Sequence, residues 1–172
     1  MTNTTAATID SLQSVPADEG DHHFFLNHLA TVKVGAGGSD SGLALVEFVA
    51  PRGFGPPLHR HIEEDEMMYV LEGEIRIDLG GGDSTVATAG AAVTLPHGIP
   101  HTWQVVSDEA RFLTINAGRR NGPSFDRFVG ALGTPTDPNA LPDPIEIDPG
   151  HVARVCAAHG IEVLGPPPPP LD

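Results

Sequence analysis

Four side chains in the middle of this 172-residue chain have the chemistry of metal ligands: His59, His61, Glu66 and His101. Neutral imidazoles combined with a carboxylate suit divalent transition metals, and geometry selects among these metals more than raw affinity does. Residues i and i+2 of a β-strand point to the same face, so one strand can present His59 and His61 to one ion. Four protein ligands leave one or two positions open on an octahedral ion, as a reactive site requires. The spacing therefore predicts one divalent transition-metal ion per chain.

These ligand types do not fix the identity of the ion, because nickel, cobalt, manganese, iron, copper and zinc all accept them. Two neighbouring residues are weaker alternatives. Asp65 replaces Glu66 as the carboxylate ligand if the strand register shifts by one residue. His97 is close to His101 in sequence but lies in a corner rich in proline and glycine. The remaining alternative is a protein that kept this arrangement of residues but no longer binds the ion.

Composition excludes several classes of function. The formal net charge of −14 disfavours binding to nucleic acid or to an anionic membrane, because both require a positive surface. The single cysteine, Cys156, excludes an intrachain disulfide. The beginning of the chain lacks the basic and apolar segments of a secretion signal, and no run approaches the ~18 apolar residues of a membrane span. We therefore expect a cytoplasmic protein.

The order of the predicted elements indicates an all-β fold. Short segments that alternate in hydrophobicity or are rich in β-branched residues follow one another and are separated by turn residues, which is typical of a sandwich or a barrel. The segment 43–49 is mostly apolar, so we expect it to be covered on both faces. The strands are expected at 29–34, 43–49, 66–71, 74–79, 85–89, 91–95, 101–105 and 111–117.

Two short helices are expected after these strands. Ser124 can cap a helix over residues 125–132, and Asp148 precedes a proline that suits the first turn of a helix over residues 150–159. Within the second helix Cys156 shares a face with valines, so we interpret it as a packing residue and not as a nucleophile.

The chain is accordingly divided into three parts. An N-terminal arm covers residues 1–22, a β-barrel covers residues 23–120, and a helical and proline-rich extension covers residues 121–172. Within the extension, residues 134–149 form a linker with little internal structure. Residues 166–170 form a polyproline tail, which is expected to be solvated unless it docks on a partner.

The strand pattern also predicts the wall of a substrate pocket. Apolar side chains on the same inward faces as the ligands would surround an open metal position, and such a cup suits a flat, hydroxylated aromatic molecule. Simple packing in the core is the alternative role for these side chains. The candidates for substrate contact are Phe48, Met68, Val70, Trp103, Val105 and Phe112.

Two segments resemble the motifs of the cupin superfamily. The segment from Gly53 to Gly73 has the pattern Gly-x5-His-x-His-x4-Glu-x6-Gly, which matches the first motif at every defined position. The segment from Gly90 to His101 has the pattern Gly-x5-Pro-x-Gly-x2-His and is similar to the second motif. That motif ends on Asn, and this chain has Val105 there. The resemblance implies a cupin-type jelly-roll β-barrel, often a homodimer, with the same four metal ligands.

The chain also resembles the small bacterial cupins grouped with quercetin 2,3-dioxygenases. The His-x-His pair, the sequence EMMYVLEGE and the ending GIEVLGPPPPP carry this likeness. It implies cleavage of a flavonol ring with loss of carbon monoxide. The first hypothesis is therefore a metal-dependent dioxygenase that acts on a flavonol-like or other enolisable aromatic substrate with O2, and Glu66 is its catalytic general base.

Two other functions stay open. One is an oxygen-independent cyclase or isomerase of a polyketide-like substrate, in which the ion acts as a Lewis acid. The other is a non-enzymatic cupin that binds a small molecule. Arg119 and Arg120 follow the last strand and are candidates for an anion contact, although a solvated pair is the simpler interpretation.

Overall fold

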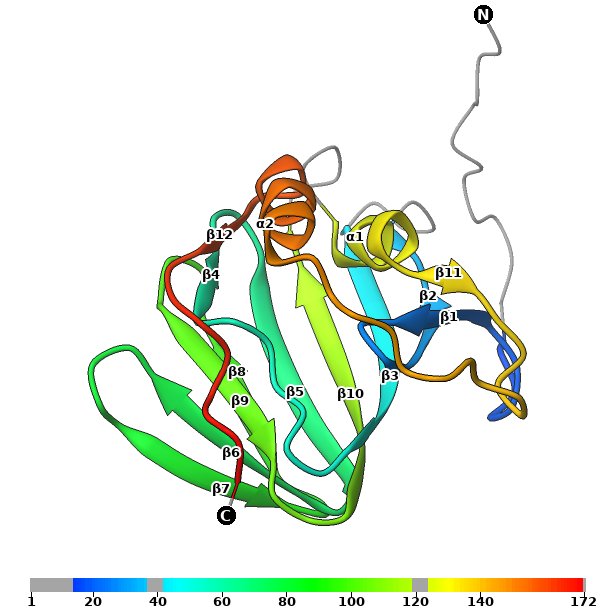
Figure 1. Ribbon diagram of the computed structural model, residues 1–172, viewed down its shortest axis with the longest axis horizontal. Helices are drawn as coiled ribbons and strands as arrows, with labels where there is room; N and C mark the ends of the chain where they lie inside the picture. Colours follow the sequence, from blue (N-terminus) through cyan, green and yellow to red (C-terminus); the bar gives the residue numbers. More distant parts are fainter. Residues whose placement is uncertain (1–13, 37–41, 119–123, 172) are drawn as a thin grey trace, which may run out of the picture.

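The computed structural model describes residues 14–36, 42–118 and 124–171, which form two antiparallel β-sheets with the hydrophobic core between them (Figure 1). Arg119 and Arg120 lie outside the described residues. None of the helices in the described ranges is long and apolar enough to span a membrane. The predicted all-β fold class is confirmed.

The first sheet has seven strands in the order β11, β1, β2, β3, β10, β5 and β8. Their bounds, in that order, are Thr134–Pro135, Asp21–Phe25, His28–Val34, Leu43–Pro51, Glu109–Ala117, Asp65–Glu72 and Ala92–Leu95. The second sheet has five strands in the order β12, β4, β9, β6 and β7. Their bounds are Ile161–Val163, His59–His61, His101–Val105, Glu74–Leu79 and Ser84–Thr88.

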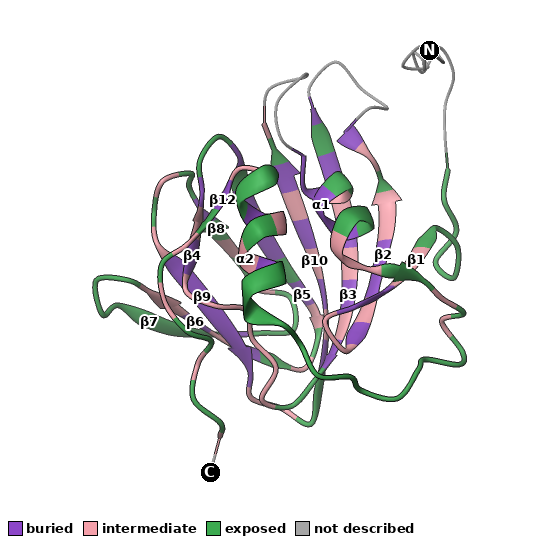
Figure 2. Ribbon diagram, turned by 45° about the horizontal axis from the view of Figure 1, so that its top comes forward, coloured by how far each residue is buried: buried purple, intermediate pink, exposed green. Residues whose placement is uncertain are grey.

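The sheets do not close into one hydrogen-bonded barrel. Among the described residues, the pairing in the first sheet ends at β11 and β8, and the pairing in the second sheet ends at β12 and β7. The expected barrel is therefore a two-sheet jelly roll, with the inward faces of both sheets packed against each other. Figure 2 shows the buried residues recurring along the central strands.

Strand β3 corrects one sequence expectation. Its burial alternates along the strand, with Ala44, Val46 and Phe48 buried and the residues between them partly exposed. The expectation that residues 43–49 are covered on both faces is therefore wrong, because only the inward face of β3 packs against the core. The outward positions carry apolar side chains at partial exposure, which hydrophobicity alone does not reveal.

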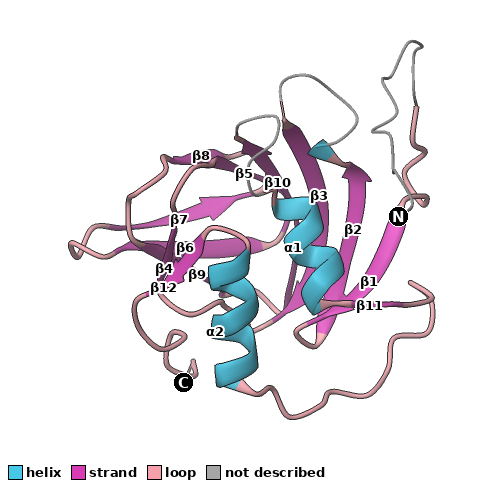
Figure 3. Ribbon diagram, turned by 90° about the horizontal axis from the view of Figure 1, so that it is seen from above, coloured by secondary structure: helices cyan, strands magenta, loops and turns pink. Residues whose placement is uncertain are grey.

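The two helices lie together at one end of the sheets (Figure 3). Helix α1 (Phe125–Leu132) packs on β1, β2 and β3, and helix α2 (Pro149–Ala158) packs on β12. Asp148 caps α2 as predicted, because its carboxylate accepts a hydrogen bond from the backbone N–H of Gly150. Ser124 occupies the N-cap position of α1, but its side chain makes no capping hydrogen bond.

Cys156 confirms the packing interpretation. It is buried on the inward face of α2, and burial raises the pKa of its thiol to about 11. A thiol with this pKa stays protonated at neutral pH, and the thiolate is the nucleophilic form of cysteine.

The C-terminal extension packs on the sheets. Strand β12 pairs with β4, so that Ile161 lies opposite His61 and Val163 lies opposite His59. Beyond it, the proline tail runs along the second sheet (Figure 1), and Gln104 donates a hydrogen bond to the carbonyl oxygen of Pro169. Four of the five prolines from Pro166 to Pro170 are exposed, as expected for a solvated tail, although the tail also contacts the protein's own sheet through Pro169.

Two motif glycines provide a matched stability test. Gly73 and Gly90 both have a positive φ, of 80° and 88°. A Cβ on Gly73 would overlap the carbonyl oxygen of Glu109 and lie 2.7 Å from Ser107 Oγ, whereas a Cβ on Gly90 would meet no atom within 4 Å. We expect Gly90→Ala to lower the free energy of unfolding by about 1–2 kcal/mol through backbone strain, and Gly73→Ala to lower it by about 3 kcal/mol or more. Urea denaturation measures both values, and equal losses would contradict the packing described here.

Candidate metal centre

Three short strands position the four predicted ligands. His59 and His61 lie on β4 two residues apart, and His59 is directly opposite His101 on β9 in the same sheet. Glu66 lies on β5 in the other sheet. One ligand atom from each of the four residues lies within 4.8 Å of the other three. The site is thus formed between the two sheets, and each sheet supplies part of it.

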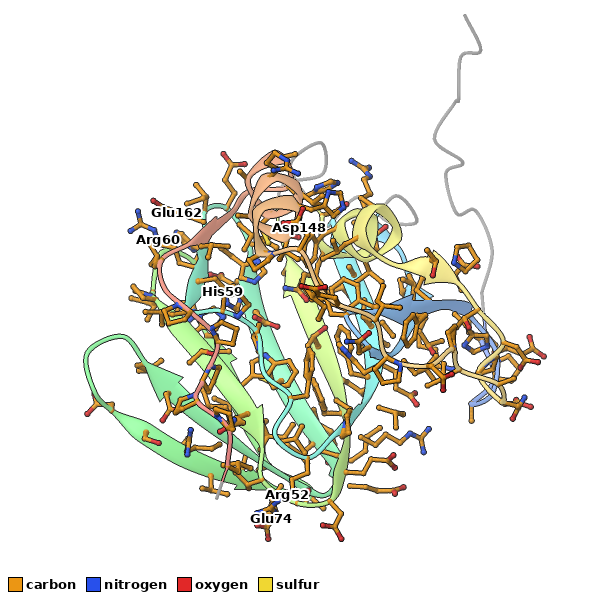
Figure 4. All side chains as sticks on the ribbon, viewed as in Figure 1. Arg52, His59, Arg60, Glu74, Asp148 and Glu162 are labelled. Atoms are coloured by element: carbon orange, nitrogen blue, oxygen red, sulfur yellow. The ribbon has the colours of Figure 1, made fainter. Side chains whose placement is uncertain are left out.

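The ligand atoms converge on the Glu66 carboxylate. Its Oε2 atom is 3.4 Å from Nε2 of His61 and 3.3 Å from Nε2 of His101. The rings of His59 and His101 are 4.5 Å apart between centroids, and the rings of His61 and His101 are nearly parallel. All four side chains are buried. Figure 4 shows His59 directed between the sheets, whereas the intervening Arg60 lies at the outer edge with Glu162.

Backbone carbonyl groups orient two of the imidazoles. Nδ1 of His59 donates to the carbonyl oxygen of Pro57 at 2.8 Å, and Nδ1 of His101 donates to that of Ile99 at 2.9 Å. A carbonyl oxygen only accepts, so Nδ1 carries the proton in each ring and Nε2 carries a lone pair. Such contacts fix the tautomer of metal-binding histidines.

His61 is oriented by a residue that the sequence analysis did not select. Glu64 is 2% exposed, and its Oε2 atom lies 3.8 Å from Nδ1 of His61. The other carboxylate oxygen of Glu64 accepts a hydrogen bond from the backbone N–H of Phe125, in the first turn of α1. Glu64 therefore replaces the side-chain cap that Ser124 does not supply. Glu64 lies in the turn between β4 and β5. The alternation of inward and outward side chains along a strand does not predict where the side chain of a turn residue points.

Burial and charge set the protonation of the metal-free site. Burial lowers the pKa of His59 to about 3, and repulsion from His101 and His61 acts in the same direction. Burial also disfavours a charge on His61, but the carboxylates of Glu64 and Glu66 outweigh it and raise the pKa of His61 to about 9. Burial alone would raise the pKa of Glu66, and the contacts with His101 and His61 instead hold it well below its usual range. At neutral pH, the metal-free site therefore pairs a His61 cation with a Glu66 anion.

The buried donors fit a metal ion. Among the described residues, Nε2 of His61 and Nε2 of His101 have no partner with hydrogen-bond geometry, although both are fully buried. Unpaired buried nitrogens cost free energy unless something binds them. Three imidazole nitrogens and one carboxylate oxygen are a donor set that divalent transition metals accept. His59, His61, Glu66 and His101 can therefore hold one such ion.

The two alternative ligands lie elsewhere. The carboxylate of Asp65 accepts hydrogen bonds from the backbone N–H and from Nδ1 of His97, and both side chains are more than half exposed. Strand β5 keeps the register in which Glu66 points inward and Asp65 points outward. Neither Asp65 nor His97 belongs to the four-residue cluster.

A small apolar cavity of about 60 Å³ adjoins the site and has His59 and Glu66 in its wall. Phe48 and Trp103, two of the proposed substrate contacts, also line this inner cavity. The other four are absent from its wall and pack in the core, because the inward faces of the strands extend beyond the cavity: Met68, Val70, Val105 and Phe112.

Most of the remaining wall comes from segments far from the motifs. His28, Phe125 and Val152 line the inner cavity, and they belong to β2, α1 and α2. A second, outer groove of about 430 Å³ shares Leu26, Phe54 and other wall residues with the inner cavity. No sequence signal identifies these residues, because contacts between distant segments place them there.

Comparison with known proteins agrees with the fold and the motifs. Residues 45–116 match the family described as Cupin domain (Cupin_2), and this range contains all four clustered ligands. The chain therefore carries a cupin domain over residues 45–116, and the resemblance to the cupin superfamily is confirmed. The polyketide cyclase RemF from Streptomyces resistomycificus has a similar structure, with a TM-score of 0.54 and 23% identity over 62% of this chain and 80% of RemF. At this identity the likeness shows the fold alone.

One curated relative of this chain carries an activity in its name. Quercetin 2,3-dioxygenase from Bacillus subtilis (strain 168) is 26% identical over 96 residues, which are 56% of this chain and 28% of that protein. The chain thus matches less than a third of the relative's length. An RmlC-like cupin family protein from Methanocaldococcus jannaschii, with a double-stranded β-helix fold, gives a TM-score of 0.49 at 17% identity over 65% of this chain and 94% of its own.

Replacing one ligand should remove the ion. We expect His101→Ala to lose the bound metal during dialysis against a weak chelator, because it deletes one of four donors. His97→Ala is the matched control: His97 lies in the same corner, but it is exposed and bonded to Asp65. Metal per chain is measured by elemental analysis, with circular dichroism to confirm folding. Equal metal content in both variants would contradict the assignment of the ligands.

Metal binding should also release a proton. His61, with its pKa of about 9, is protonated at pH 7 in the metal-free protein and must lose that proton to bind an ion. We expect about one proton released per ion at pH 7, and an apparent affinity that rises with pH by up to about tenfold per unit until it levels off near pH 9. Titration calorimetry in two buffers of different ionisation enthalpy measures the proton count. A pH-independent affinity would contradict the His61–Glu66 ion pair.

Proposed function

We propose that this cupin is a metal-dependent dioxygenase of an enolisable, hydroxylated aromatic substrate such as a flavonol. The observation that carries the proposal is the position of the His59–His61–Glu66–His101 cluster, because two of its members form part of the wall of an apolar cavity. A purely structural metal site would be closed by its own ligands. The curated relative named quercetin 2,3-dioxygenase supports this choice of reaction.

In this proposal the metal ion, Glu66 and the apolar wall residues have separate roles. The bound ion supplies a Lewis acid that lowers the pKa of a substrate hydroxyl group. The Glu66 carboxylate lies in the cavity wall and accepts the hydroxyl proton as a general base. Phe48, Trp103 and the other apolar wall residues exclude water from the electron-rich ring while it meets O2. In a flavonol, the reaction opens the heterocycle, inserts both oxygen atoms of O2 into the product and releases one carbon monoxide.

The two volumes determine how such a substrate would fit. The inner cavity, at about 60 Å³, holds roughly two water molecules and is smaller than the ~150 Å³ cavity that binds benzene. The outer groove, at about 430 Å³, has the size of an ordinary ligand pocket. We infer that the enolised ring edge enters the inner cavity and that the remainder of the substrate occupies the groove. The two volumes adjoin, because Leu26, Phe54, Pro56, Pro57, Val152 and Val163 line both of them.

The narrow inner cavity also gives a second candidate function. A cavity of this size suits binding of a small molecule without turnover, which would make the protein a non-enzymatic cupin. The oxygen-independent cyclase or isomerase uses the same ion and wall, so geometry does not separate it from the dioxygenase. Dependence on O2 and formation of product distinguish all three functions.

The test uses the full chain loaded in turn with nickel, cobalt, manganese, iron(II), copper or zinc. With 3-hydroxyflavone or quercetin in air, we expect at least one of these metals to support consumption of one O2 and release of one carbon monoxide per substrate molecule. Without O2, we expect the substrate not to be consumed. Glu66→Gln that still holds the ion should lower kcat roughly a hundredfold or more, whereas His97→Ala should keep it. Equal turnover without O2 would favour the cyclase or isomerase. Binding without turnover would favour the non-enzymatic cupin.

The remaining expectations are part of the same proposal. An aromatic small molecule and O2 are the proposed partners, and neither nucleic acid nor a membrane surface is among them because of the net charge of −14. A homodimer in the cytoplasm stays a prediction. Sedimentation of the metal-loaded chain measures its oligomeric state directly.

A further inference from the structure

His28 is a buried polar residue in the cavity wall that the proposed chemistry does not yet use. It begins β2, is 2% exposed, and lines the inner cavity together with His59 and Glu66. Its ring centroid is 4.1 Å from that of Phe54 and 5.4 Å from that of Phe48. The Phe25 ring is a further neighbour at 5.5 Å, so three aromatic rings surround an imidazole that lies outside the metal cluster.

The two ring nitrogens of His28 have different roles. Nδ1 lies 3.3 Å from the carbonyl oxygen of Leu26, which can only accept, so Nδ1 carries the proton. Nε2 is then a hydrogen-bond acceptor. It is fully buried and has no hydrogen-bond partner within the described part of the chain. Burial also lowers the pKa of His28 to about 4, so Nε2 keeps its lone pair at neutral pH.

The hairpin before His28 is held under backbone strain. Leu26 and Asn27 form the two-residue turn between β1 and β2, with φ of 50° and 69°. Leucine rarely adopts a positive φ, and such strain is concentrated at functional sites. The Asn27 amide also exchanges two hydrogen bonds of 2.9 Å with the backbone of Ile145, which fastens the linker to this turn. Both features fix the place where the His28 ring enters the wall.

A second polar group in the same wall lacks a partner. Thr114 on β10 lines the inner cavity, and its Oγ1 atom is buried without a hydrogen-bond partner among the described residues. The rest of this wall, apart from the metal cluster, is almost wholly apolar. A buried acceptor in such surroundings is costly in the absence of a ligand. A ligand that carries a hydroxyl group in addition to the one on the ion would remove that cost.

We propose that His28 is a substrate-binding residue whose Nε2 atom accepts a hydrogen bond from a hydroxyl group on the edge of an aromatic ligand, where that edge enters the inner cavity. The proposal rests on the dioxygenase function above, because that function brings a hydroxylated aromatic molecule into this cavity. It assigns to His28 the recognition of a hydroxyl group that the ion does not bind. Thr114 can hydrogen-bond to a neighbouring polar group of the same ligand.

The test compares phenol with toluene as probes of the full chain in both its metal-free and its zinc-loaded form, because zinc can itself bind the phenol hydroxyl group. The two molecules have nearly the same shape, and only phenol can donate a hydrogen bond. We expect phenol to bind about fivefold to tenfold more tightly than toluene, as one buried hydrogen bond provides. The preference should disappear in His28→Leu and persist in Thr114→Val. The ¹⁵N resonance of His28 Nε2 should shift when phenol is added and stay in place when toluene is added.

Stability separates a binding role from a structural one. Removal of an unsatisfied buried acceptor should raise the melting temperature, so we expect His28→Leu to melt higher than the original chain in the absence of ligand. His28→Gln keeps a side-chain acceptor, and it should retain part of the preference for phenol even if the leucine variant folds poorly. A structural histidine would instead give a lower melting temperature in both variants.

Every other outcome overturns the proposal. If phenol and toluene bind equally, water satisfies Nε2 well enough and no ligand hydroxyl group is recognised. If Thr114→Val alone removes the preference, the hydroxyl group binds to Thr114. If neither probe binds, the inner cavity admits no ring. O2 consumption with 3-hydroxyflavone is measured independently, so a dioxygenase that lacks this contact with His28 is recognised as such.

Discussion

The placement of one carboxylate opposite three imidazoles, across the space between two β-sheets, is the constraint on which the rest of this structure depends. Glu66 belongs to the first sheet, and His59, His61 and His101 belong to the second. A one-residue shift of either sheet would turn its ligands to the outer face. The core between the sheets therefore stabilises the fold and also fixes the register that the metal centre requires.

Burial makes this arrangement costly unless its charges are compensated. In the metal-free protein, the charges of His61 and Glu66 offset each other, and Glu64 links the same histidine to the beginning of α1. A divalent ion bound by these four residues would take the place of the proton on His61. The contact through Glu64 connects the metal site to the C-terminal extension, whose strand β12 also pairs with the ligand strand β4. The residues that can hold the metal are thus in contact with the C-terminal extension at two places.

The wall of the inner cavity has a different origin from the ligands. The ligands come from a segment of the chain that the cupin motifs span. The wall brings together β2, the segment before β4, both helices and β12. A change in the extension can therefore alter the shape of the cavity without touching the ion.

The all-β class, most strand positions, both helices and the four clustered ligands could be predicted from the amino-acid pattern, because period-2 alternation and local spacing fix which side chains share a face. The same pattern also selected Phe48 and Trp103 for the cavity wall. Only the tertiary structure placed Met68 and Phe112 in the core instead of at the wall, bound the proline tail to the second sheet, and brought Glu64 and His28 into the site. Those outcomes depend on contacts between segments far apart in the chain, which a local pattern does not encode.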